Sequence, residues 1–487
     1  MRNSSTNKIY VYTLVLLMLI LIPSCVAPSH FIDGSSDAIE SSSNEQQLFP
    51  DYVYNQEQVQ TLTSVTGKGL AISEEGYYFI EKKILHYYDI SEGAAFPLCT
   101  KTSCMHTDKN CDAYIYDYSD EKPDWVTNCL GDKVFFYNDH LYMMSQQWDA
   151  SPVLFQYNKD FTEQKEIGRM SDGSASPRIL TQDVASSVVH NGWLYYLTLE
   201  MREDWFSSQD PKLLTVPYTL CRIKLEEKSE REELYTFEFP IDYDVVTATS
   251  QGIRLMNSGD DIYCIASIRY RFNTTTDPVQ QRVIRYNESE GAELLWTYTG
   301  EERINLFGSE GEVPVHMLHS SMNESRDFSY MTYGPDEKKD MWNPFTSIWS
   351  VNMESKESRK IYQTPYSQLF DFITDGNNYY FTEIAPGQCF LTAIDHEGKL
   401  IRRYEFEYSD SYIKTMEEKN IPREQWTGGA GLMLIDGRYI MLGSASYSAV
   451  LKGLTSDEID ENTRVYGMIR LEDFLDGKDV EIQQIYE

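Results

Sequence analysis

Three cysteines and one histidine lie close together in the stretch CTKTSCMHTDKNC, which begins at Cys99. Their spacing is C-x4-C-x-H-x4-C. Cysteine thiolates and a neutral imidazole are ligands that zinc prefers, and four of them complete a tetrahedron. A short polar loop without a core of its own is stabilised strongly by such a clip. The spacing therefore makes Cys99, Cys104, His106 and Cys111 candidate ligands of a structural zinc ion.

Disulfides are a second interpretation of the same loop. Exported proteins often oxidise their cysteines in pairs, and the three loop cysteines together with nearby Cys129 allow three different pairings. The chain has 8 cysteines, and Cys221, Cys264 and Cys389 lie in strand-like stretches, where buried thiols are common. Free thiols in the loop are a third interpretation. The residues alone leave metal, disulfides and free thiols open.

The first residues, MRNSSTNKIYVYTLVLLMLILIPSC, are typical of an export signal, because a positive start precedes an apolar run. That run, residues 11–22, is shorter than the ~20 residues that cross a bilayer. Ile22, Ser24 and Cys25 resemble the end of a bacterial lipoprotein signal, whose cysteine receives a diacylglyceryl thioether. The resemblance implies a signal peptide over residues 1–24 and fatty acids such as palmitate on Cys25. We therefore expect a bacterial membrane protein, lipid-anchored and facing outside the cytoplasm; an ordinary secretory signal is the alternative.

The segment after Cys25 is rich in serine and acidic residues, so it cannot bury enough apolar surface to offset the entropy of ordering. We predict a flexible tether over residues 25–64. Residues 65–487 are long enough to form a large core. The formal net charge of −34 disfavours nucleic acid as a partner, because its phosphates would be repelled.

One pattern recurs along the remaining chain: an apolar stretch, a tight turn containing glycine, and an aromatic-rich stretch. Examples are LAISEEGYYFIE, VVHNGWLYYLTLE and LMLIDGRYIMLGS, with turns at Gly76, Gly192 and Gly437; Gly259 and Gly376 hold similar places. Asn-Gly and Asp-Gly supply the positive φ values of two-residue hairpins. A second hairpin with a charged turn follows each time, which is typical of a strand pair with one solvated side.

Two hairpins make a four-stranded sheet, and the pairs recur every ~40–70 residues, as propeller blades do. The sequence predicts an all-β fold, a single β-propeller over residues 65–487 with about seven four-stranded blades, six or eight being possible. Two stacked β-sandwiches are the competing architecture. The Cys/His loop is an insertion at residues 97–128, between the first two blades. The best helix candidate begins at Ser411, and TLTSVTGKG is a candidate strand for closing the ring.

The loop also carries a family resemblance. Leu98-Cys99-Thr100-Lys101, Cys104-Met105-His106, Asp108 and Cys111-Asp112-Ala113 resemble a motif of uncharacterised β-propeller-like lipoproteins from Gram-positive anaerobes. The similarity covers nearly the whole chain. It implies a membrane-tethered propeller outside the cytoplasm and no established activity.

Motifs of known enzymes are missing from the sequence. It contains no H-E-x-x-H, no Walker loop and no dinucleotide fingerprint, so we assign no catalytic residue, and the ligand-binding residues are unknown. We expect a recognition module that binds a peptide, a glycan or a partner protein. The alternatives are a scaffold subunit of an envelope complex, and a propeller enzyme, such as a glycan lyase or hydrolase, whose site is assembled from several blades.

Overall fold

The computed structural model describes residues 70–116, 130–145, 152–171, 177–178, 187–200, 215–240, 253–258, 260–268, 280–299, 321–322, 327–333, 345–352, 357–366, 368–375, 377–423, 431–443 and 466–486, together with Tyr54, Gln56, Ser355 and Trp426. All of them belong to one compact unit, Glu45–Glu487. The predicted signal peptide, Cys25 and Cys129 lie outside the described residues.

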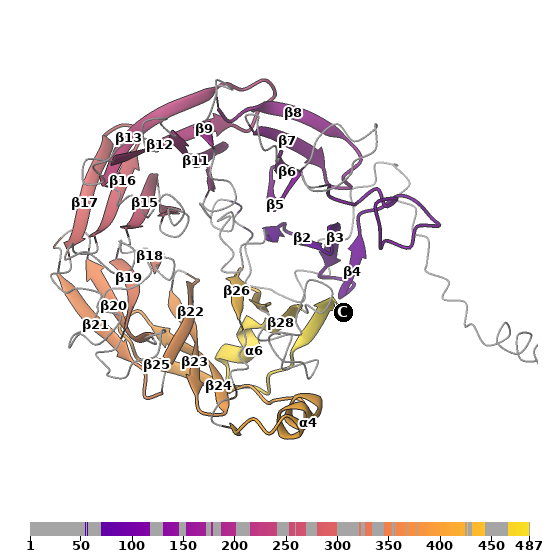
Figure 1. The fold of residues 1–487 in the computed structure, drawn as a ribbon, viewed down its shortest axis with the longest axis vertical. Helices are drawn as coiled ribbons and strands as arrows, with labels where there is room; N and C mark the ends of the chain where they lie inside the picture. Colours follow the sequence, from indigo (N-terminus) through magenta and orange to yellow (C-terminus); the bar gives the residue numbers. More distant parts are fainter. Residues whose placement is uncertain are drawn as a thin grey trace, which may run out of the picture. The chain divides into compact units, whose positions relative to one another are not determined.

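Six antiparallel sheets are present in the described part of the chain, and they follow one another around a ring (Figure 1). The first three contain β1 (Leu70–Ile72), β2 (Gly76–Glu81), β3 (Ile84–Asp89) and β4 (Ala94–Pro97); β5 (Leu130–Tyr137), β6 (His140–Ser145), β7 (Val153–Asn158) and β8 (Gln164–Arg169); and β9 (Pro177–Arg178), β10 (Val188–His190), β11 (Trp193–Glu200), β12 (Thr215–Lys224) and β13 (Arg231–Pro240).

The next sheet contains β14 (Ile253–Ser258), β15 (Asp261–Ile268), β16 (Gln280–Asn287) and β17 (Gly291–Thr299). The largest contains β18 (Ser321–Met322), β19 (Asp327–Tyr333), β20 (Phe345–Asn352), β21 (Ser358–Gln363), β22 (Gln368–Thr374), β23 (Asn378–Ala385), β24 (Gln388–Asp395) and β25 (Leu400–Glu405). The last contains β26 (Leu432–Ile435), β27 (Tyr439–Leu442), β28 (Tyr466–Arg470) and β29 (Gln483–Tyr486).

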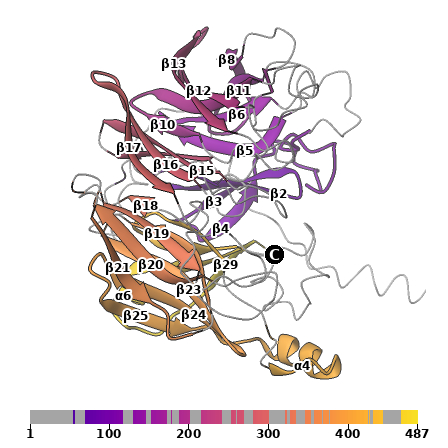
Figure 2. The ribbon, with the colours of Figure 1, turned by 60° about the vertical axis from the view of Figure 1, so that its left-hand side comes forward.

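This arrangement confirms the predicted all-β propeller. Four consecutive strands pair antiparallel in each sheet, and turning the molecule shows them side by side (Figure 2). The largest sheet holds two such sets, β18–β21 and β22–β25, which are joined where Phe345 pairs with Leu369. Seven four-stranded units in the sequence therefore make six sheets, within the predicted range.

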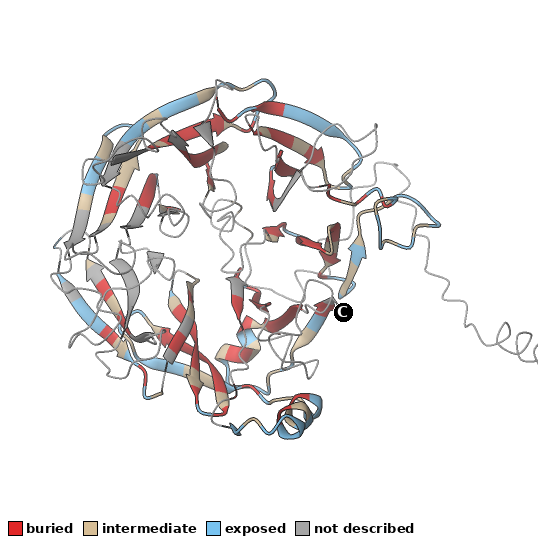
Figure 3. Ribbon diagram, in the orientation of Figure 1, coloured by how far each residue is buried: buried red, intermediate tan, exposed pale blue. Residues whose placement is uncertain are grey.

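The burial of residues changes from the inner to the outer strands of each sheet. Buried residues gather on the inner and middle strands, whereas exposed residues lie mainly on the outermost strands (Figure 3). Several apolar clusters span neighbouring sheets: one joins Tyr78 of β2 to Phe136 of β5 and Leu141 of β6. Contacts between blades therefore form a large part of the core.

The glycine turns of the inner hairpins are partly confirmed. Asn191 (φ 50°) and Gly192 (φ 78°) form the turn before β11, and Gly437 (φ 89°) lies in the turn before β27. Gly76 is needed for a different reason: a Cβ atom at this position would lie 2.0 Å from the carbonyl oxygen of Tyr88. Gly259 and Gly376 lie outside the described residues.

Two helices accompany the strands in the described residues. Helix α4 (Asp410–Glu418) confirms the predicted helix, and Ser409 caps it by accepting a hydrogen bond from the amide of Tyr412. Helix α6 (Leu471–Leu475) interrupts the last outer hairpin, where the sequence predicted strands alone. Leu471 and Phe474 are both buried, and their spacing of three residues places them on one helix face.

Buried side chains join the first sheet to the last. Arg438 and Asp436 are both fully buried and form an ion pair, with 2.9 Å between Nη2 and Oδ2. Arg438 also donates hydrogen bonds to the backbone carbonyls of Ser73 (3.0 Å) and Glu74 (2.6 Å), and the Tyr77 hydroxyl donates to Asp436 (2.6 Å). The ring is therefore closed by side chains here; the candidate closing strand TLTSVTGKG lies outside the described residues.

Asp371 of β22 has an unusual conformation and environment. Among the described non-glycine residues it alone has a positive φ (51°) within a strand, and the pairing with β23 shifts there between Phe370 and Ile373. Its carboxylate accepts hydrogen bonds from the amide of Leu432 (3.3 Å) and the hydroxyl of Thr382 (3.4 Å). Burial raises the pKa of Asp371 to about 7.

Asp371→Asn is expected to stabilise the propeller at high pH. Because the folded pKa lies above that of an exposed carboxyl, the contribution of Asp371 to stability is present below pH ~4 and lost as the pH rises through ~7. Asparagine tolerates the left-handed conformation and carries no charge. We expect a gain of about 2 kcal/mol at pH 8, allowing for the partial exposure of the side chain, that vanishes near pH 4. Urea unfolding at both pH values measures this, and an equal effect at the two would contradict it.

Candidate metal centre

The Cys/His loop is attached to the first sheet at both of its ends. At the entry, the amide of Leu98 donates to the carbonyl of Leu85 (2.9 Å). At the exit, the amide of Leu85 donates to Ala113 (2.9 Å), and the amide of Ile115 donates to the carbonyl of Lys83 (2.7 Å). The exit segment thus lies beside the start of β3, where β4 has ended. Both ends are fixed on the same strand, so the loop returns to its starting point.

Tight turns shape the inside of the loop. The amide of Cys104 donates to the carbonyl of Lys101 (3.2 Å), and the amide of Cys111 donates to that of Asp108 (3.1 Å). The Asp108 side chain accepts a hydrogen bond from the amide of Asn110 (2.8 Å). His106 has a positive φ of 54°. These turns bring together four residues that are between two and twelve positions apart in the chain.

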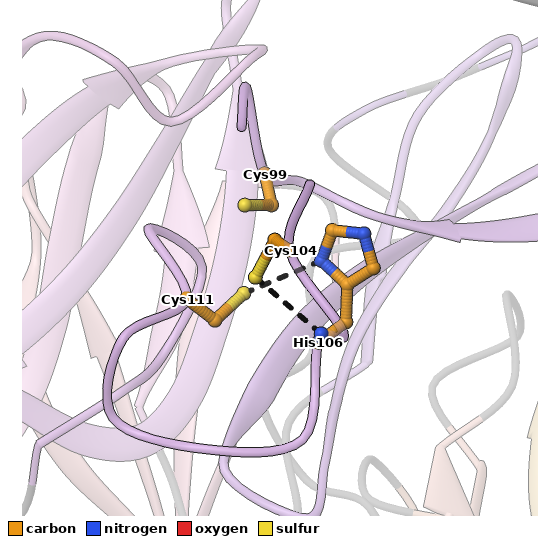
Figure 4. A group of neighbouring side chains, drawn as sticks. All are labelled: Cys99, Cys104, His106 and Cys111. Carbon is orange, nitrogen blue, oxygen red and sulfur yellow. Dashed lines mark hydrogen bonds between the residues drawn. The ribbon is translucent and has the colours of Figure 1, made fainter. Parts of the chain in front are cut away.

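The structure brings all four predicted ligands together (Figure 4). The ligand atoms of Cys99, Cys104, His106 and Cys111 lie within 4.8 Å of one another. Nδ1 of His106 lies 3.6 Å from Sγ of Cys111, and the amide of His106 donates to Sγ of Cys104 (3.4 Å). Three sulfurs and one imidazole nitrogen can hold a metal ion, and as a set of four they leave no open position for a substrate.

The cluster lies at the boundary between core and solvent. Cys111 has no exposed surface and, with Ala113 and Ile115, belongs to the apolar cluster between the first two sheets. Cys99 and Cys104 are half-buried and pack against the same cluster. One side of the site is therefore held by the propeller core, and the other faces solvent.

The thiols differ in how easily they ionise. Burial raises the pKa of Cys111 to about 12, and the neighbouring Cys99 adds to this. Burial also opposes ionisation of Cys99, but the backbone amides of Lys101 and Asp112 outweigh it by hydrogen bonding to the sulfur, and they hold its pKa below its ordinary value. A bound cation would favour the thiolate at every one of these sulfurs.

An ion pair closes the loop beside the cluster. Nζ of Lys101 lies 2.7 Å from Oδ1 of Asp112, and the Thr100 hydroxyl donates to Oδ2 of Asp112 (3.0 Å). The bond from Lys101 holds the pKa of Asp112 below its usual value. We assigned these residues no role from the sequence. The signal was the pair of opposite charges just after the first and last cysteine of the motif.

None of the three loop cysteines forms a disulfide in the described part of the chain. The disulfide interpretation stays a prediction, because it includes Cys129. The strand cysteines are as predicted: Cys221, Cys264 and Cys389 are buried.

A polar cavity of about 220 Å³ between the first two sheets is a second place where a ligand could bind. Lys159 on its wall contacts Asp139 (3.0 Å) and Glu75 (3.5 Å), so these charges compensate one another. Tyr54 and Gln56, from the predicted tether, also line it; Gln56 exchanges two hydrogen bonds with Asn138. Tyr54 and Gln56, within the predicted tether, thus lie against the propeller.

Similarity to known proteins is confined to solved structures. No protein-family model matches the chain, and no curated protein sequence is significantly similar to it. Among solved structures, the chain is similar to a prolyl endopeptidase (TM-score 0.47, 11% identity, 88% of this chain and 50% of that chain). It is also similar to the β-propeller domain of the Trilobed protease from Pyrococcus furiosus (TM-score 0.40, 11% identity), and the match covers 86% of this chain and 97% of that domain. A third similar structure is an uncharacterised protein from Listeria monocytogenes (TM-score 0.37, 8% identity), where the match covers 72% of this chain and 82% of that chain.

The chain spans about half the length of the prolyl endopeptidase. At these identities the similarity concerns the fold alone. None of the helices in the described residues is long enough and apolar enough to cross a membrane.

Proposed function

We propose that this chain is a bacterial lipoprotein outside the cytoplasm, whose propeller is a recognition module and whose loop holds a structural zinc ion. The observation that carries the zinc site is the convergence of three sulfurs and one imidazole nitrogen within 4.8 Å. Such a ligand set is typical of structural zinc, because a catalytic site keeps one position open. The ion would join the entry and the exit of the loop beside β3.

Metal analysis tests the zinc site. The purified chain is expected to contain about one zinc ion per molecule, and Cys104→Ser is expected to lose most of it because one of four ligands is removed. Cys221→Ser is the matched control, since Cys221 is a buried thiol on β12 outside the cluster. Equal zinc content in the wild-type chain and Cys104→Ser would rule out the proposed clip.

The lipid anchor rests on Ile22, Ser24 and Cys25 at the end of the apolar run. Cys25 is expected to take up labelled palmitate during growth, and Cys25→Ser is expected to abolish both the labelling and the recovery of the chain with the membrane fraction. Ser24→Ala keeps the cysteine and serves as the control. Unchanged labelling of Cys25→Ser would contradict the anchor.

The recognition role is supported by the propeller fold and by a ligand set that suits structure rather than catalysis at the one Cys/His cluster found in the described residues. The partner would be a peptide, a glycan or another protein. Capture from native membranes with the wild-type chain, followed by measurement of direct binding to each captured species, tests this role. Turnover of a captured glycan would favour the enzyme alternative instead.

A further inference from the structure

The proposed zinc clip presents some of its sulfurs to solvent and hides another. Cys99 and Cys104 are half-buried, whereas Cys111 has no exposed surface. Met105, which lies between two of the proposed ligands, is 81% exposed. The solvent side of the cluster is therefore open to a small reagent, which can reach the sulfurs of Cys99 and Cys104 more readily than that of Cys111.

We propose that the clip is an oxidation-sensitive switch, in which a peroxide joins Cys99 to Cys104 and releases the metal. The inference rests on the proposed zinc site. The sulfurs lie within 4.8 Å of one another, whereas a disulfide brings two sulfurs to about 2.05 Å. Short movements of the loop can supply the difference, because Cys99 and Cys104 are only partly buried and the polar residues between them are exposed.

Hydrogen peroxide is the only oxidant that the reaction needs. One thiolate attacks the O–O bond and becomes a sulfenic acid, and hydroxide leaves. The second thiolate then attacks that sulfur, so that the S–S bond forms and a second hydroxide leaves. The two sulfurs together lose two electrons, and the peroxide oxygens take them up.

Oxidation of this pair removes two of the four ligands. Cys111 and His106 alone cannot close a tetrahedron around zinc, so the ion is released. The exit of the loop is expected to stay in place, because Ala113 and Ile115 are buried in the core between the first two sheets. The polar part, residues 100–109, is expected to loosen, and trypsin is then expected to cut faster after Lys101 and Lys109.

The experiment uses the full-length, metal-loaded chain and hydrogen peroxide. A chromogenic chelator in solution is expected to report release of the bound metal, with recovery after dithiothreitol and added zinc. Trypsin places the three loop cysteines in different peptides: Cys99 in peptide 84–101, Cys104 in peptide 102–109, and Cys111, together with Cys129, in peptide 110–133. After oxidation, mass spectrometry is expected to find the first two peptides linked, and Cys111 still open to alkylation.

Met105→Leu is the control, because peroxide also oxidises exposed methionine; this variant is expected to release its metal as the wild type does. A metal-loaded chain that keeps its metal in peroxide, or that loses it without linking peptides 84–101 and 102–109, overturns the switch but not the clip. A chain isolated without metal overturns the clip and the switch together.

Discussion

Arg438→Met is expected to destabilise the propeller by about 3–5 kcal/mol, because it removes one partner of a fully buried ion pair. In the wild type, the guanidinium contacts Asp436 and donates to the carbonyls of Ser73 and Glu74 in the first sheet. Methionine fills a similar volume but leaves a buried carboxylate and two carbonyl oxygens without these donors. Chemical unfolding measured at pH 7 gives the free energy difference.

The part of the propeller that loses stability in Arg438→Met can also be measured. Because Arg438 joins the last sheet to the first, amide exchange is expected to rise in β1, β2, β26 and β27 before it rises elsewhere in the described strands. Lys414→Met is the control, since the Lys414–Glu418 pair (3.8 Å) on α4 is exposed and such pairs contribute about 0.5 kcal/mol or less. A similar loss in both variants would mean that burial of the ring-closing pair is unimportant.

Loss of the proposed zinc ion is expected to open the junction between the loop and β3. Cys104→Ser, or treatment of the wild type with a strong chelator, is expected to weaken this region by about 3 kcal/mol, because metal binding and folding of a small site are coupled. The amides of Leu85 and Ile115 are the best reporters, since each donates a hydrogen bond across this junction. Their exchange is expected to become about 100-fold faster.

The same measurement separates a local effect from a global one. The amides of the last sheet are expected to exchange at unchanged rates, because the cluster that contains Cys111 is made of described residues from the loop and the first two sheets. Cys221→Ser removes a buried thiol that belongs to a different apolar cluster from the loop, and it is expected to leave Leu85 and Ile115 protected. Unchanged exchange at these two amides after metal removal would show that the ion does not hold the loop.

The Arg438→Met experiment and the metal-removal experiment test contacts at two different places in the ring. Arg438 acts where the chain's last sheet meets its first, and the Cys/His cluster acts between the first and the second. At both places, polar or candidate metal-binding groups act in addition to apolar contacts between the sheets.

Local patterns in the sequence determined much of the fold. Alternating apolar residues, glycine turns such as Asn191-Gly192 and the recurrence of hairpin pairs indicate four-stranded blades, because strand pairing and tight turns depend on neighbours in the chain. The spacing of Cys99, Cys104, His106 and Cys111 indicated a cluster, since the turns between them are short. Helix α6 was missed, because the apolar pair Leu471 and Phe474 fits a strand pattern as readily as one helical turn.

Contacts between distant residues could be decided only by the tertiary structure. Arg438 and Ser73 are separated by 365 positions, and no local pattern marks Arg438 as buried, since arginine is ordinarily exposed. The same holds for Asp371, whose left-handed conformation within a strand arises from a bulge and a contact with Leu432 on the next blade. The sequence by itself thus determined the blades and the ligand set, whose interactions are local. Only the folded ring decided the burial of the charges that close it, because burial depends on which blades become neighbours.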